Sequence, residues 1–185
     1  MYDGFNERRA AQIAAFFTEK EGGEIAVLKL TKLIYLADRE SMAVTGFPIT
    51  NDHFVSMPHG PVNSLTLNFV DGNLSSDEWS SLISDRTNYC VGLTREITID
   101  DHDELSEIDV EALNAVWVKF GHMNKWEIRD WTHKNCLEWE DPNGSCTPIP
   151  YERVLKYLGV ESPDDLAEEI RSDRQVENLF AELRG

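Results

Sequence analysis

The segment from about residue 25 to residue 45 constrains the fold more than any other part of the chain. Its apolar residues lie on more than one face of the helix that their spacing predicts. One stripe is formed by Leu30, Leu33, Ile34 and Ala37, and outside it lie Leu28, Tyr35 and Leu36. A helix that is apolar on several faces is buried on several sides. We therefore expect a central helix that ends at Gly46 and Pro48, with the other elements packed around it.

Further helices are predicted on both sides of this segment. Capping residues, prolines and apolar spacing place them at about 6–22, 62–71, 106–120, 125–135, 151–158 and 163–183. Alternating apolar residues predict a strand over 89–99, and we expect residues 53–57 to pair with it. The predicted fold class is mainly α with a small β element. It is a bundle of six or seven helices around the central one, with a short sheet of two or three strands.

The chain is long enough for one well-formed core. With 185 residues it falls near the usual domain size, and five Trp and eight Phe are too many for a disordered chain. Three cysteines cannot build a disulfide framework, the N-terminus lacks a signal-peptide pattern, and no apolar run reaches the ~20 residues that span a bilayer. We expect a single domain over 1–185, located in the cytoplasm, without a membrane partner.

The net charge of −17 limits the kinds of molecule that the chain is expected to bind. Seventeen basic residues against thirty-four acidic ones disfavour direct nucleic-acid binding, which depends on Lys and Arg. Eight acids fall within 96–111 without a Lys or Arg, and eight more fall within 161–182 beside two Arg. Either run is interpreted as a solubilising surface or as a surface complementary to a basic partner.

The sequence contains no recognisable catalytic, metal or cofactor motif. His133, Cys136 and Cys146 have no common zinc-site spacing, and neither a nucleophile elbow nor a phosphate-binding glycine loop is present. We expect no metal, no cofactor and no enzymatic activity. One alternative stays open, in which Tyr35, His59, Asp130 and His133 form a hydrolase or nucleotide-handling site.

Two groups of motifs are more specific than the rest of the chain. The first contains Lys29-Leu30-Thr31-Lys32-Leu33-Ile34-Tyr35, then Thr45-Gly46-Phe47-Pro48-Ile49, then His59-Gly60-Pro61-Val62. The second contains Trp126 to Lys134, with Thr132-His133, followed by Glu138-Trp139. In this order they resemble the SocA-like antitoxin domain, also called Panacea, of bacterial and phage proteins. Ile128 and Glu138 depart from the family's usual Leu and Pro.

The resemblance implies a Panacea-like core over 5–141 and a C-terminal helical extension over 142–185. It implies an antitoxin that neutralises a cognate toxin by direct contact, and the acidity of the chain suits a basic toxin. A second role implied by the family is an adaptor that delivers the toxin to a AAA+ protease, with the last helix engaging the protease. The motif residues expected to line a partner-binding surface are Lys32, Tyr35, His59, Gly60, Pro61, Trp126, Asp130, His133 and Trp139.

Overall fold

The computed structural model describes residues 4–184, except for the side chains of residues 99, 177 and 180–184. The helices in this part of the chain are α1 (Glu7–Lys20), α2 (Val27–Thr45), α3 (Ser64–Val70), α4 (Asp77–Leu82), α5 (Glu107–Phe120), α6 (Lys125–Asn135), α7 (Tyr151–Leu158), α8 (Pro163–Arg184) and the 3₁₀ turn η1 (Ile99–His102). The strands are β1 (Glu24–Ala26), β2 (Phe54–Met57), β3 (Gly60–Asn63), β4 (Cys90–Gly92) and β5 (Thr147–Ile149). The prediction of a mainly α protein with a small β element is confirmed.

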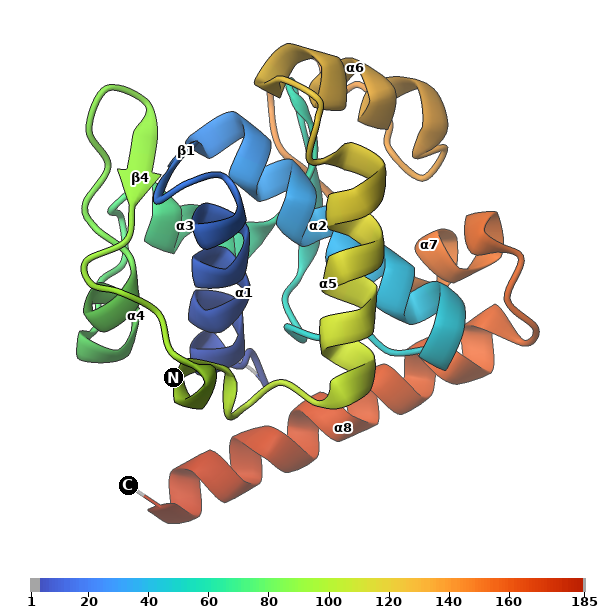
Figure 1. Ribbon diagram of the computed structural model, residues 1–185. Coiled ribbons are helices and arrows are strands. Elements are labelled where there is room, and N and C mark those ends of the chain that lie inside the picture. Colours follow the sequence, from blue (N-terminus) through green and yellow to red (C-terminus); the bar gives the residue numbers. More distant parts are fainter. Residues whose placement is uncertain (1–3, 185) are drawn as a thin grey trace.

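The predicted central helix is α2. It lies in the middle of the fold, with α1 and α5 on either side and α6 across one end (Figure 1). Leu30, Leu33 and Tyr35 are fully buried, in agreement with apolar residues on more than one face. The helix ends at Gly46, which adopts the left-handed conformation (φ 86°) and donates its N–H to the Met42 carbonyl at 3.1 Å.

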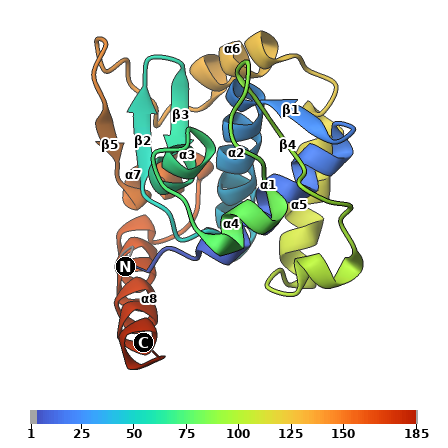
Figure 2. The same ribbon diagram turned by 90° about the vertical axis from the view of Figure 1, so that its left-hand side faces the viewer.

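Two small antiparallel sheets flank the helices. One pairs β1 with β4, with Ile25 opposite Val91. The other has the strand order β3-β2-β5 and lies beside α2 (Figure 2). Because β2 and β3 are separated only by Pro58 and His59, they form a hairpin in which Val55 pairs with Val62.

The predicted strand over 89–99 is wrong in its length and in its partner. Only β4 is extended, and it pairs with β1, whose last two residues the central-helix prediction had counted as the start of the helix. Residues 53–57 pair instead with the local hairpin strand β3 and with β5. Further along, Arg95 forms an ion pair with Asp101, whose carboxylate also accepts a hydrogen bond from the Thr98 N–H at 2.8 Å. Because of these contacts the chain turns and forms η1, whereas the alternating apolar residues had predicted a continuous strand up to residue 99.

Helix α4 was not predicted. Ser76 caps it by accepting a hydrogen bond from the Trp79 N–H at 3.1 Å, and Trp79 is buried. The segment is six residues long, too short for helical periodicity to stand out. Helix α3 begins at Ser64, two residues after the predicted start, because Val62 belongs to β3.

Two buried aspartates hold the loop between α2 and α3. The carboxylate of Asp38 accepts hydrogen bonds from the Ile49 N–H at 2.8 Å and from the Asn63 amide at 2.6 Å. Burial raises the pKa of Asp38 to about 6, although these hydrogen bonds favour its charged form. Asp52 accepts the N–H of Thr66 at 2.8 Å, near the start of α3. The Thr45–Ile49 motif is thereby fixed against the central helix.

Helix α8 runs along one side of the fold, and its C-terminal end extends past the other elements (Figures 1 and 2). Ala167 and Ile170 are fully buried, and Arg174 donates to the Tyr151 hydroxyl at 2.7 Å and lies 2.8 Å from the His53 ring nitrogen. The Gly4 N–H donates to Asn178 at 2.5 Å. These contacts join the helix to the sheet and to the N-terminal segment. None of the described helices is both long enough and apolar enough to cross a bilayer.

Candidate functional site

A groove of about 610 Å³ opens where α2 begins, between the β2–β3 hairpin and the start of α6. We call it the apolar groove. The residues that line it are Val27, Leu28, Thr31, Lys32, Met57, Pro58, His59, Val62, Leu67, Asp71, Arg86, Tyr89, Lys125 and Trp126. Most of its walls are aliphatic or aromatic. This composition is typical of sites that take up a ligand or a partner side chain.

Two aromatic side chains of the groove are unusually exposed. Trp126 is 49% exposed and Tyr89 is 71% exposed. Asn124 fixes Trp126 at the second position of α6, because its side chain accepts the N–H groups of both Trp126 and Glu127 at the helix start. The Trp126 ring lies 6.4 Å from the ring of His59, which projects from the tip of the hairpin.

Tyr89 occupies a strained backbone position. It and Asn88 form the turn between Thr87 and Cys90, and both have positive φ angles, 52° for Asn88 and 64° for Tyr89. Left-handed backbone is costly for a bulky side chain and clusters at functional sites. The Tyr89 carbonyl also accepts the Val27 N–H at 2.9 Å, which ties the turn to the start of α2. The alternating apolar pattern over 89–99 predicted Tyr89 to lie in a strand, and nothing in the sequence marked the turn, which contains no glycine.

Lys32 lies in the floor of the groove and has no solvent-exposed surface. Its ammonium group donates a hydrogen bond to the Pro61 carbonyl at 2.8 Å. Burial lowers the pKa of Lys32 to about 7. The nearby Cys136 thiol is neutral, because burial raises its pKa to about 12. Within the described part of the chain, no carboxylate forms an ion pair with Lys32.

The Gly60-Pro61 motif positions the hairpin against two helices. Gly60 has a φ of 99°, and a Cβ at this position would lie 2.8 Å from the Thr132 hydroxyl oxygen and 3.2 Å from the Lys32 Cε. Only glycine fits both this conformation and this close approach. The next carbonyl, that of Pro61, is the one that Lys32 contacts. Gly60 and Pro61 therefore place the wall of the groove.

Tyr35 is part of the buried scaffold beneath the groove. Its hydroxyl donates to the Glu138 carboxylate at 2.7 Å, and Arg39 donates to the same oxygen at 2.7 Å. Burial, followed by the charge of Glu138, raises the pKa of Tyr35. Glu138, one of the two departures from the family pattern, therefore forms a buried ion pair that proline cannot form.

His133 and Trp139 support the hairpin from behind. Their rings stack with centroids 4.2 Å apart and planes 8° apart, and the Trp139 indole N–H donates to the Met57 carbonyl at 3.0 Å. Burial and the positive charge of Lys32 lower the pKa of His133. Asp130 lies elsewhere: its side chain is 63% exposed, it pairs with Arg129 at 2.5 Å, and it lines a separate cavity with Trp131 and Lys134.

Three of the nine predicted site residues, Lys32, His59 and Trp126, thus line the groove. Gly60 and Pro61 shape it, whereas Tyr35, His133 and Trp139 form its support. The four residues of the catalytic alternative, Tyr35, His59, Asp130 and His133, do not share a cavity. No hydrogen bond joins any two of these four described side chains. Across the described residues, no three His, Cys, Asp or Glu side chains come together as ligands of a metal ion would.

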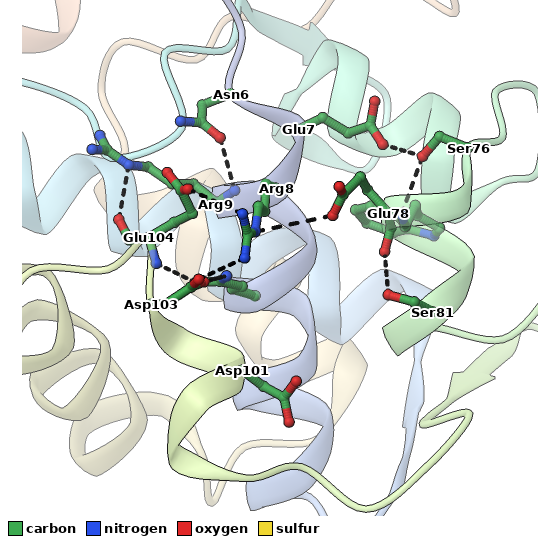
Figure 3. A network of polar contacts seen from close by, with 12 residues as sticks. Asn6, Glu7, Arg8, Arg9, Ser76, Glu78, Ser81, Asp101, Asp103 and Glu104 are labelled. Carbon is green, nitrogen blue, oxygen red and sulfur yellow. Dashed lines mark hydrogen bonds and ion pairs between the residues drawn. The ribbon is translucent and has the colours of Figure 1, made fainter.

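The acidic run over 96–111 is partly engaged within the fold. Arg8 lies between Glu78 on α4 and the acids near η1, with its guanidinium 2.5 Å from Asp103 and 3.4 Å from Glu104 (Figure 3). Asp109 accepts the Ser106 N–H at 2.9 Å in the cap of α5. Part of this run therefore stabilises contacts between elements.

The sequence model of one protein family, described as "Antitoxin SocA-like, Panacea domain", matches residues 30–140. The chain belongs to this family. No curated protein and no solved structure matches it. The matched range of the Panacea domain contains most of the groove, including Lys32, the hairpin, Tyr89 and Trp126. Only Val27 and Leu28 among the lining residues precede it.

Proposed function

We propose that this Panacea-domain protein is an antitoxin that neutralises a cognate toxin by direct contact, and that the toxin docks on the apolar groove. One observation carries the proposal. Motif residues far apart in the sequence meet at a single open groove that carries two exposed aromatic side chains. Trp and Tyr in partly closed pockets are the residues that most often dominate protein–protein binding energy.

The character of the groove favours binding over chemistry. Its walls are mainly apolar, and the ammonium group of Lys32 is already bonded to a backbone carbonyl. Outside the groove the chain is strongly acidic, and a surface with this charge attracts a basic toxin and accelerates its encounter. The proposed complex therefore combines long-range attraction with an apolar contact at the groove.

Co-expression with the product of the neighbouring gene tests this function. Wild-type protein should restore growth and co-purify with that product, and Trp126→Ala should lose both effects while keeping its fold, since Trp126 is half exposed. Val118→Ala is the matched control, because Val118 is 80% exposed on α5 and does not line the groove. A neighbour that is harmless alone and does not co-purify would contradict the antitoxin role. Equal behaviour of the two variants would contradict docking at the groove.

The adaptor role is a second candidate, favoured by the projecting end of α8. The second half of α8 carries Val176 and Leu179, which are 48% and 58% exposed. Under this role the toxin occupies the groove while α8 engages a AAA+ protease. Val176→Asp together with Leu179→Asp should then lengthen the lifetime of the toxin in cells and leave its binding unchanged. If this double variant loses toxin binding, α8 belongs to the toxin interface and the adaptor role is refuted.

A further inference from the structure

The charges around the apolar groove are opposite in sign to those of the whole chain. Three basic side chains, Lys32, Arg86 and Lys125, line it, against one carboxylate, that of Asp71. The chain as a whole has twice as many acidic residues as basic ones. A locally positive site on such a protein selects a negative group in whatever binds there.

Two of these cations have no ionic partner in the described part of the chain. The only carboxylate in the lining, Asp71, pairs with Arg86, whose guanidinium also lies 5.1 Å from the centre of the Tyr89 ring. Lys125 is half buried and lies over the Trp126 ring at 5.3 Å. Lys32 is buried with only a carbonyl contact. Half-buried ammonium groups are usually paired, so a carboxylate of a ligand can fill the place beside Lys125 that no described carboxylate fills.

The remaining lining specifies the rest of the ligand. Val27, Leu28, Val62 and Leu67 provide aliphatic walls, and Tyr89 and Trp126 stand at the rim. Such walls fit an apolar side chain. A nucleotide is disfavoured, because its phosphates need several converging N–H donors of the kind that glycine-rich loops supply, and the lining contains no such loop.

We propose that the apolar groove receives a segment of the toxin in which an apolar side chain stands next to an Asp or Glu carboxylate. The apolar side chain enters between the aliphatic walls, and the carboxylate meets Lys125 at the rim, above Lys32 in the floor. This inference rests on the proposed function. The interface then has two regions of opposite charge. A toxin that is basic overall faces the acidic exterior of this chain and presents an acidic segment to the groove.

Charge reversal at matched positions separates this local contact from long-range attraction. Lys125→Glu and Lys134→Glu change the net charge equally and lie on the same helix, but Lys134 is outside the groove. With the purified product of the neighbouring gene as the probe, Lys125→Glu should raise the Kd roughly tenfold or more, whereas Lys134→Glu should leave it unchanged or lower it. Equal effects of the two variants would overturn the proposal.

A second measurement does not depend on the toxin. The peptide acetyl-Leu-Glu-Phe-Leu-amide and its Gln counterpart are titrated into the full ¹⁵N-labelled chain, with the indole signal of Trp126 assigned through Trp126→Phe. The Glu peptide should bind severalfold more tightly, and Lys125→Glu should remove the difference. Equal binding of the two peptides, or saturable binding of GTP or ATP that moves the same signal while neither peptide does, would refute the proposal.

The two experiments also separate this inference from the proposed function. If the neighbouring gene product does not bind the wild-type chain, the antitoxin role fails and the peptide pair alone decides the chemistry of the groove. If the product binds but the matched variants and the two peptides behave alike, the antitoxin role stands and the acidic segment is refuted.

Discussion

Replacing the buried Lys32 by methionine should stabilise the protein, although it removes a hydrogen bond. Methionine has nearly the length of lysine and fills the same space between α2 and the hairpin. The lysine is unfavourable at neutral pH because its pKa falls from 10.5 to about 7 on burial. The native state therefore binds fewer protons than the unfolded chain between these two values, and the unfolding free energy of the wild type rises with pH across this window.

The pKa shift sets the expected magnitude. At pH 7 it corresponds to about 4 kcal/mol of lost stability, and at pH 9 to about 2 kcal/mol. Methionine removes this loss but leaves the Pro61 carbonyl without its donor, which costs about 1–3 kcal/mol. Lys32→Met should therefore stabilise the fold by about 2 kcal/mol at pH 7 and have little effect at pH 9.

Urea unfolding at the two pH values measures this difference. Wild type and Lys32→Met should differ most at pH 7 and converge at pH 9, with unchanged m-values. Lys134→Met is the control, because Lys134 is exposed and its replacement should not change the pH dependence. A difference that is the same at both pH values would refute the reasoning, since it would mean that Lys32 keeps its ordinary pKa in the native state.

Three further predictions concern the hairpin and the groove. Gly60→Ala should destabilise the fold by more than about 2 kcal/mol, because of its positive φ and close contacts, whereas Gly144→Ala, also at positive φ but in open space, should cost about 1 kcal/mol by thermal unfolding. Tyr35→Phe should cost about 1–3 kcal/mol in urea unfolding, since Glu138 loses a buried donor. Tyr89→Asn should leave stability within about 1 kcal/mol of wild type, because Asn tolerates the left-handed turn, but should weaken co-purification with the toxin. Loss of stability without loss of binding in this last variant would contradict a role for Tyr89 in the groove.

Every α-helix except the short α4 could be predicted because its signals are local. Asn6 and Ser106 accept the backbone hydrogen bonds that cap α1 and α5, as their positions before apolar residues of helical spacing indicate. The strand pairings could not be predicted in the same way. Each strand has only three or four residues, and pairing depends on which segments α2 brings together. The alternation over 89–99 gives no information about β1, its true partner.

For the candidate site, too, the sequence singled out some residues correctly, but it did not show which side chains the fold brings together. Motif order singled out Lys32, His59 and Trp126, and these three reach the groove from separate elements. It also singled out Asp130, which faces another cavity, because helical spacing places a residue on a face without saying what covers that face. Tyr89 has no sequence signal, since its position depends on a strained turn.

Substitutions in one part of the groove should therefore destabilise the fold, whereas substitutions in the other part should not. The hairpin is anchored by the buried contacts of Lys32, Gly60 and Trp139, so substitutions at Gly60 or Trp139 also disturb the fold. The wall that carries Tyr89 is a two-residue turn held by backbone bonds between Thr87 and Cys90, and its side chains point away from the core. Substitutions in this turn can change the chemistry of the groove at small cost in stability. Under the proposed function, substitutions at Tyr89 should therefore change which toxin is bound at little cost in stability, while the anchored part keeps the groove open.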